Sequence, residues 1–173
     1  MSRLRRLILS DRVFFITCRV HRLRRKLNEA EFAVLAEVVR ERRQAQRFLL
    51  TAWVFLPDHW HAIIFPRWPL LISTVMKSIK VGGSKRINAG RGERGVLFQG
   101  RFVDRALRTV KEYNEKVAYI HGNAVKAGLV ERAQDWKWSG LHDYTGSVRA
   151  PAGRGSPIPV DRILMPGIER KRI

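Results

Sequence analysis

The chain has 173 residues, 45% of them hydrophobic, which is enough for one domain with a substantial core and argues against a disordered protein. Its 34 lysines and arginines outnumber its 15 acidic residues and give a formal net charge of +19. An excess of this size favours nucleic acid as the partner over an anionic membrane surface. No apolar run is long enough to span a membrane, and the basic start is too short for a signal peptide. We therefore expect a cytoplasmic protein without a membrane partner.

The pattern of apolar residues predicts strands and helices in alternation along most of the chain. Strands are predicted at residues 13–20, 48–55 and 59–65, with a fourth strand or a short strand pair within 96–105. Helices are predicted from Asn28 to about Gln46, from near Pro69 onward, and from Thr109 to about Ala127. We expect Gly82-Gly83 to loosen the second helix and residues 89–95 to form a flexible basic loop.

The predicted order β-α-β-β-α-β is the split βαβ plan of a ferredoxin-like fold. The predicted class is therefore α+β, with helices on one face of an antiparallel sheet and an additional C-terminal helix that bears tyrosines. Residues 1–145 would form this domain. Residues 146–173, which are rich in proline, glycine and arginine, would form an extended tail without a core of its own.

Two histidines, separated by one tryptophan, begin the third predicted strand. Side chains alternate along a strand, so His59 and His61 would project from the same face about 7 Å apart. Trp60, Ala62 and Ile64 would fill the opposite face. Two imidazoles on one face can hold a divalent metal ion, but they can equally be two unrelated polar residues on a solvated sheet.

The last predicted helix carries two tyrosines on different faces. Tyr113 falls in an apolar stripe, whose other members are Val110, Val117, Ile120 and Ala124. Tyr119 lies about 130° from the middle of that stripe, where a large aromatic side chain has no folding reason to be, although surface tyrosines are common. Asn123 lies four residues further on nearly the same face. Its amide oxygen could be a third metal ligand, or the residue could simply belong to the end of the helix.

Four segments, taken in order, resemble one family. They are Leu56-Pro57-Asp58-His59-Trp60-His61, Ser78-Ile79-Lys80 through Ile87-Asn88, Phe98-Gln99-Gly100-Arg101-Phe102 with Asp104-Arg105, and Tyr119 through Val130 followed by Trp136-Lys137-Trp138-Ser139. Together they resemble the IS200-like single-tyrosine transposases, and most of all the REP-associated tyrosine transposases, which are HUH single-strand nucleases. In two departures, Ala124 stands where this family usually has proline, and Asp58 stands where it more often has asparagine.

The resemblance implies a metal-dependent endonuclease and strand transferase that acts on single-stranded DNA, at repeats that form hairpins. His59, His61 and Asn123 would hold Mg²⁺ or Mn²⁺, and Tyr119 would attack the scissile phosphate to leave a 5′-phosphotyrosyl link and a free 3′-hydroxyl. The protein would be nucleoid-associated, as a monomer or a homodimer, since the wider family contains dimers that exchange tyrosine helices. The basic residues expected to hold the single-stranded or hairpin DNA are Arg22, Arg24, Arg25, Lys80, Lys85, Arg86, Arg101 and Arg105.

Two rival functions remain open from the sequence. A domesticated relative could keep the DNA-binding surface as a regulator and no longer cut. An ordinary metal nuclease could instead use water as the nucleophile, with Tyr119 incidental to the reaction.

Overall fold

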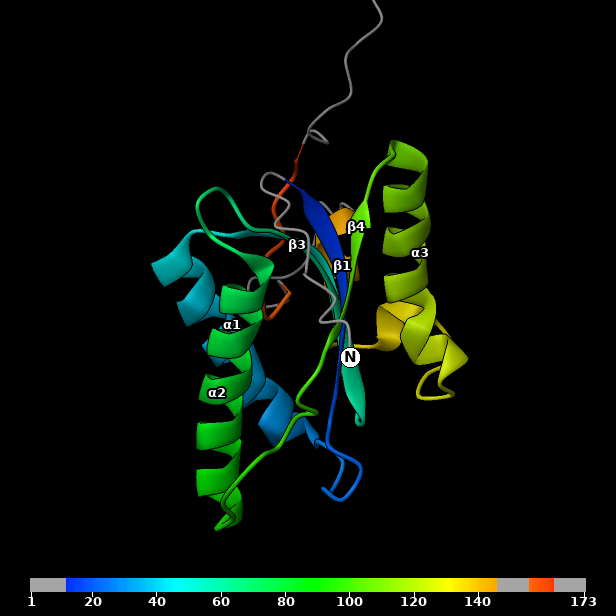
Figure 1. Ribbon diagram of the computed structural model, residues 1–173. Coiled ribbons are helices and arrows are strands. Elements are labelled where there is room, and N and C mark those ends of the chain that lie inside the picture. Colours follow the sequence, from blue (N-terminus) through cyan, green and yellow to red (C-terminus); the bar gives the residue numbers. More distant parts are fainter. Residues whose placement is uncertain (1–11, 146–155, 164–173) are drawn as a thin grey trace, which may run out of the picture.

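The computed structural model describes residues 12–145 and 156–163, in which helices cover both faces of a four-stranded antiparallel sheet (Figure 1). The strands are β1 (Val13–Arg19), β2 (Leu49–Phe55), β3 (His59–Phe65) and β4 (Val103–Leu107). The helices are α1 (Glu29–Gln46), α2 (Ile72–Arg91), α3 (Val110–Lys126) and the short α4 (Leu141–Tyr144), with a 3₁₀ turn, η1 (Ala133–Asp135). The strand order β2-β3-β1-β4 places β3 between β1 and β2, so the predicted split βαβ plan and the α+β class are confirmed.

The alternation of side chains along the strands separates two apolar layers. Trp60, Ala62 and Ile64 belong to the larger core cluster, which contains the inner residues of α1 and α2. Ile63 belongs to the second cluster together with Ile120 of α3. Figure 1 accordingly shows α1 and α2 on one side of the sheet and α3 on the other, which we call the α3 face. The alternation predicted for the third strand is therefore confirmed.

Helix α2 differs from its prediction at both ends. It begins at Ile72 rather than near Pro69, and it continues through Gly82-Gly83 to Arg91, so residues 89–91 are helical. The two glycines do not loosen the helix, because they serve its packing against α1. A Cβ atom at Gly82 would lie 3.0 Å from Cγ1 of Val38, and one at Gly83 would lie 3.2 Å from Cδ1 of Leu35. The missing side chains let the two helices approach closely.

The fourth predicted strand is also shorter than expected. Regular pairing covers only Val103–Leu107, and the preceding segment joins the sheet through one isolated bridge between Val20 and Phe98. Phe98 is buried in the core although it lies outside any strand. The apolar run that suggested a longer strand therefore reflects burial of this segment under α2.

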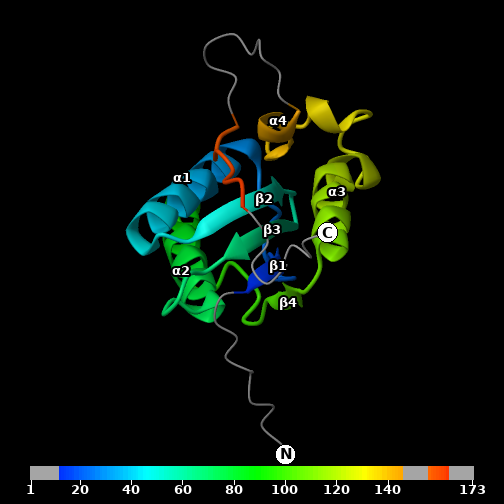
Figure 2. The ribbon, with the colours of Figure 1, turned by 90° about the horizontal axis from the view of Figure 1, so that it is seen from above.

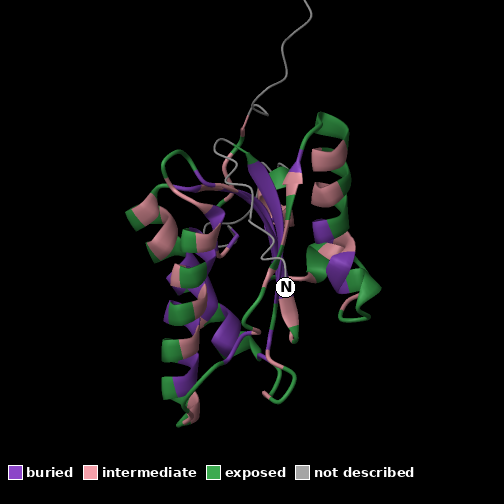
Figure 3. Cartoon of the chain, in the orientation of Figure 1, coloured by how far each residue is buried: buried purple, intermediate pink, exposed green. Residues whose placement is uncertain are grey.

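Helix α3 packs on the sheet mainly through its second half. Its buried residues are Ile120, His121, Asn123 and Ala124. Val110, which the predicted stripe includes, is 44% exposed, whereas Tyr113 and Val117 pack against the second cluster at its margin. Figure 3 shows this gradient from exposed to buried residues along α3.

Residues 156–163 lie against β2 and α1 (Figure 2). Ile158 is fully buried in the larger core cluster, and its carbonyl oxygen accepts a 2.8 Å hydrogen bond from Nε1 of Trp53. Asp161 forms a 2.5 Å ion pair with Arg43 and accepts a hydrogen bond from the backbone N–H of Leu50. The rest of the predicted tail lies outside the described residues, and the domain boundary at residue 145 stays a prediction.

Within residues 12–145 and 156–163, no helix combines the length and the apolar character that crossing a membrane requires.

Candidate active site

The two histidines lie at the start of β3, on the α3 face of the sheet. Their side chains share this face because one residue separates them on a strand, and their ring centroids are 4.8 Å apart. In the register of the sheet, Thr17 lies opposite His61 and Arg19 lies opposite His59. Strand β1 therefore contributes a hydroxyl and a guanidinium to the same part of the surface.

His61 is buried, with a relative exposure of 3%, and its ring stacks on Phe15 at 5.3 Å. Its Nδ1 lies 2.9 Å from the hydroxyl oxygen of Thr17, whereas its buried Nε2 makes no hydrogen bond to any described residue. Burial, with smaller contributions from His59 and from the cationic side chains of Arg19 and Lys116, lowers the pKa of His61 to about 4. The ring is therefore neutral at pH 7 and can keep a lone pair on Nε2.

His59 is more accessible than His61 and has a carboxylate as its neighbour. Its Nδ1 lies 2.7 Å from Oδ1 of Asp58, and its side chain is 17% exposed. Each of the two imidazoles thus has its Nδ1 oriented by an oxygen atom. Histidines that bind metals have this arrangement, because the partner at one ring nitrogen fixes the tautomer and the direction of the other nitrogen. The histidine pair therefore fits a metal ion.

Tyr119 reaches this pair from α3, whose first turn is capped by the hydroxyl of Thr109. Its ring centroid lies 5.3 Å from that of His61 and 5.9 Å from that of Phe15, and the residue is 39% exposed. The other tyrosine of the helix points elsewhere, since the hydroxyl of Tyr113 lies 3.2 Å from that of Tyr144. The structure thus brings Tyr119, and not Tyr113, to the histidines.

Asn123 lies one turn beyond Tyr119 and is buried, with a relative exposure of 6%. Its Nδ2 donates a 3.1 Å hydrogen bond to the carbonyl oxygen of Tyr119, which couples the amide group to the backbone of the tyrosine. No group of three or more histidine, cysteine or acidic side chains that could hold a metal ion occurs in the described part of the chain. A metal ion at His59 and His61 would therefore need other oxygen ligands, and an amide such as that of Asn123 is chemically suitable.

Cationic side chains surround the ring of Tyr119. Nζ of Lys116 lies 5.1 Å from the centroid of this ring and 4.7 Å from that of Phe15, and Nζ of Lys126 lies 5.6 Å from the Tyr119 ring. Sequence reasoning did not single out Lys116, Phe15, Thr17 or Arg19. The alternation of residues 15, 17 and 19 along β1 was a usable signal, because it places these three side chains on one face.

Several of the basic residues predicted to hold DNA are paired within the chain. Four guanidinium groups form ion pairs, which are Arg24–Glu93 at 2.6 Å, Arg25–Glu31 at 3.1 Å, Arg86–Glu41 at 2.6 Å and Arg105–Glu112 at 2.9 Å. Lys80 donates hydrogen bonds to the carbonyl oxygens of Gln99 and Gly100. Arg22, Lys85 and Arg101 are exposed.

These residues do not form one cluster. Arg105 lies opposite Phe15 in the register of β1 and β4 and therefore shares the α3 face with the histidines. Lys80, Lys85 and Arg86 belong to α2 on the other side of the sheet. Any role of the eight residues in DNA binding stays a prediction.

Comparisons with known proteins identify a family. No family model matches the chain. The REP-associated tyrosine transposase of Escherichia coli (strain K12) is 30% identical over 143 residues, which cover 82% of this chain and 84% of the relative. The solved structure of a REP-associated tyrosine transposase bound to a REP hairpin superposes with a TM-score of 0.73 at 27% identity, over 95% of this chain and 99% of the other. The chain therefore belongs to the REP-associated tyrosine transposases.

Proposed function

We propose that this transposase-family protein cleaves and rejoins single-stranded DNA through a covalent bond to Tyr119, with hairpin DNA as its substrate. The observation that carries the proposal is the contact between Tyr119 and His61, whose ring centroids are 5.3 Å apart. A phenol beside two imidazoles combines a nucleophile with candidate ligands for a divalent metal ion. The solved relative bound to a REP hairpin supports hairpin DNA as the partner.

The bond changes at the phosphate balance within this scheme. The Tyr119 oxygen bonds to phosphorus while the bond from phosphorus to the 3′-oxygen breaks. Tyr119 loses its proton, and the departing 3′-oxygen gains one. A 5′-phosphotyrosyl link and a free 3′-hydroxyl result, and attack by a 3′-hydroxyl on the link joins the strands and releases Tyr119. The link keeps the phosphodiester energy, so no nucleotide cofactor is required.

His59, His61 and Asn123 would hold Mg²⁺ or Mn²⁺. When bound, such an ion polarises the scissile phosphate and offsets the negative charge that develops on it. The neutral ring of His61 fits this role, since its Nε2 is buried without a hydrogen-bond partner among the described residues. Thr17 and Asp58 would orient the two imidazoles through Nδ1.

The cationic side chains around the site would bind the phosphate backbone on either side of the cleaved bond. Lys116 and Lys126 lie against the ring of Tyr119, and Arg19 lies opposite His59 on β1. Phe15, between Lys116 and His61, would provide an aromatic surface near the cleaved bond. Positive charge interleaved with aromatic rings is the usual composition of a surface for single-stranded nucleic acid.

A denaturing gel tests the proposal directly. The protein is incubated with Mn²⁺ and a 5′- or 3′-labelled single-stranded hairpin DNA, and the gel is examined for a covalent protein–DNA adduct. We expect an adduct with the natural protein and with the control Tyr113→Phe, and none with Tyr119→Phe. An adduct that survives Tyr119→Phe and disappears in Tyr113→Phe would assign the wrong tyrosine.

The same gel separates the two rival functions. Cleavage without an adduct would indicate a metal nuclease that uses water. Tight binding without cleavage would indicate a regulator that has kept only the DNA-binding surface. Both results would overturn the proposal.

A further inference from the structure

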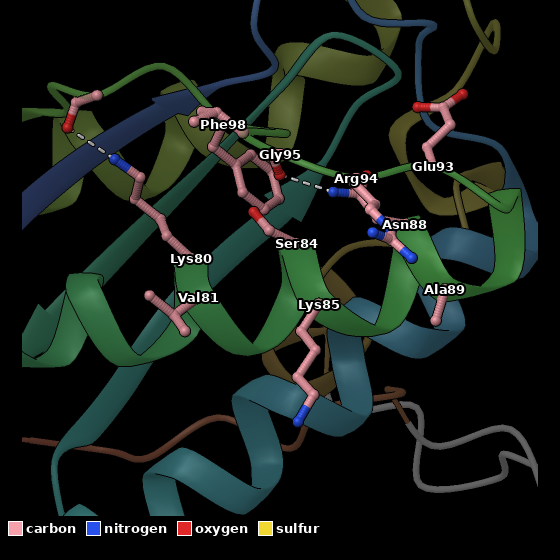
Figure 4. A pocket seen from close by; sticks show the side chains of 12 residues that line it. Lys80, Val81, Ser84, Lys85, Asn88, Ala89, Glu93, Arg94, Gly95 and Phe98 are labelled. Carbon is pink, nitrogen blue, oxygen red and sulfur yellow. Dashed lines mark hydrogen bonds between the residues drawn. The ribbon is translucent and has the colours of Figure 1, made fainter.

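A groove with a volume of about 560 Å³ lies between α2 and the segment of residues 93–100 (Figure 4). Because α2 covers the side of the sheet opposite α3, this groove is separate from the site of Tyr119 and His61. Val81 and Val96 line the groove and are 59% and 60% exposed, and the buried ring of Phe98 forms part of its wall. Val81, Val96 and Phe98 therefore give the groove an apolar wall.

A buried polar atom lies in the wall of the same groove. Asn88 is only 5% exposed, and its Nδ2 donates a 2.7 Å hydrogen bond to the carbonyl oxygen of Gly95. Its Oδ1 is buried and has no hydrogen-bond partner among the described residues. A buried acceptor without a donor is unfavourable, so this amide is suited to a ligand that brings an N–H group.

The charged side chains of the groove favour an anion. Lys85 and Arg94 are exposed at its border, and Figure 4 shows Lys85 extending from α2 away from the loop. Glu93 is the acidic residue among those that line the groove, and Arg24 neutralises it in a 2.6 Å ion pair. Lys80 extends toward the segment that carries Gly100 and donates a hydrogen bond to its carbonyl oxygen.

Hydrogen bonds connect the groove to the end of β1 that reaches the proposed nuclease site. The backbone N–H of Gln99 donates to the carbonyl oxygen of Arg19, and the N–H of His21 donates to that of Leu97. Arg19 lies opposite His59 in the sheet. The groove and the histidines therefore lie at the same end of the sheet on opposite faces, and a flexible strand that leaves one can pass around this end to the other.

We propose that this groove binds an unpaired nucleobase of the DNA. The base would lie against Phe98, Val81 and Val96, an N–H of its Watson–Crick edge would donate to Oδ1 of Asn88, and Lys85 and Arg94 would contact the adjoining phosphates. Every natural base carries such an N–H donor, and in a duplex that donor is already used, so the groove selects unpaired DNA. The inference rests on the proposed function, because it assumes that single-stranded DNA is the substrate.

Fluorescence anisotropy with labelled dodecamers tests this inference. The probes are (dA)12, (dT)12 and a dodecamer of abasic tetrahydrofuran residues, which has the same phosphates but no bases. Ala89→Trp fills the groove from an exposed helix position. Gly90→Trp is the control, because Gly90 is the next residue and does not line the groove. A Cβ atom at Gly90 would meet no atom within 4 Å, so the new side chain has room there. Asn88→Ala removes the buried acceptor.

We expect the natural protein and Gly90→Trp to bind at least one homopolymer about tenfold more tightly than the abasic strand. Ala89→Trp and Asn88→Ala should lose most of this preference for strands with bases over the abasic strand. Both variants should keep the affinity of the natural protein for the abasic strand. If Ala89→Trp binds every dodecamer as the natural protein does, or if the bases confer no advantage on the natural protein, the inference is wrong. If the groove instead binds a protein partner, Ala89→Trp should bind every dodecamer as the natural protein does.

The variant Tyr119→Phe separates this test from that of the proposed function. It should still bind a homopolymer more tightly than the abasic strand, because Tyr119 lies on the other face of the sheet. It should form no covalent adduct. Loss of the advantage in Tyr119→Phe would place the recognised base at the nuclease site and not in the groove.

Discussion

The ring of Tyr119, on α3, contacts the ring of His61, on β3, within a single chain. The contact arises because α3 packs its second half on the face of the sheet where His61 projects. One chain therefore presents the proposed nucleophile and the proposed metal ligands together. Exchange of tyrosine helices between two chains is not needed to bring these groups into contact.

Catalysis within one chain can be tested by mixing two inactive variants. Tyr119→Phe lacks the nucleophile and His61→Ala lacks the imidazole, so neither should form the covalent DNA adduct. Because the two groups already lie in contact within one chain, we expect an equimolar mixture to remain inactive in the gel assay. Restored adduct formation in the mixture would show that the two groups can come from different chains.

The hydroxyl of Thr17 should control the metal affinity of His61. Thr17→Val keeps the shape of the side chain and removes the oxygen that lies 2.9 Å from Nδ1. We expect the affinity for Mn²⁺, measured by electron paramagnetic resonance, to fall about 10- to 100-fold. Thr51→Val is the matched control, because the hydroxyl of Thr51 is buried on β2 without a hydrogen-bond partner among the described residues. Equal affinity in Thr17→Val and the natural protein would contradict the orienting role of Thr17.

Lys116 should contribute one phosphate contact at the site. Its ammonium group lies over the rings of Phe15 and Tyr119 and forms no ion pair with a carboxylate of the described residues. Lys116→Met should therefore lower the slope of log affinity against log salt concentration by about 0.7 for single-stranded DNA. Lys111→Met removes an exposed charge near the start of the same helix and should leave the slope nearly unchanged. The measurement is a series of anisotropy titrations at increasing salt.

Local patterns predicted the parts of the site that depend on one element at a time. The alternation of a strand places His59 and His61 on one face, and the turn of a helix separates Tyr119 from Tyr113. The α+β order follows from the same two periodicities. These features could be predicted because each depends on residues that are close together in the sequence.

The neighbours across the sheet could not be predicted in the same way. Thr17 meets His61, and Arg105 meets Phe15, only because β1 pairs with both β3 and β4 in a particular register. The glycines of α2 were misinterpreted for a similar reason, since their role lies in contacts with Val38 and Leu35 of another helix. The groove at Asn88 also depends on a segment that folds back over α2.

Glu31 and Glu41 carry similar ion pairs in different surroundings, and they should differ in their contribution to stability. Glu31 caps α1 together with Asn28 and binds Arg91 at 2.7 Å, and the Arg91 side chain is only 2% exposed. Glu31→Gln removes the nearest counter-charge of this buried guanidinium, whose other carboxylate neighbour, Glu93, lies 4.0 Å away. It should lower the free energy of unfolding by about 3 kcal/mol. Glu41→Gln disrupts the solvent-exposed pair with Arg86 and should lower the free energy of unfolding much less, because water already screens the two charges. Urea denaturation of the two variants measures both values, and equal losses would contradict the distinction.

The same carboxylate should make stability depend on pH in the acid range. Hydrogen bonding from Arg91 holds the pKa of Glu31 below its ordinary value of 4.5. As the pH falls, the Glu31 carboxylate is therefore protonated at a higher pH in the unfolded chain than in the folded chain. The contribution of Glu31 to the free energy of unfolding is complete above the unfolded pKa and decreases as the pH falls through the folded pKa. The difference in unfolding free energy between the natural protein and Glu31→Gln should be constant above about pH 5.5 and shrink as the pH falls further below 4.5. Urea denaturation at a series of pH values down to about 3 measures this difference. If the full difference persists at the lowest pH, the carboxylate does not stabilise the fold through its charge.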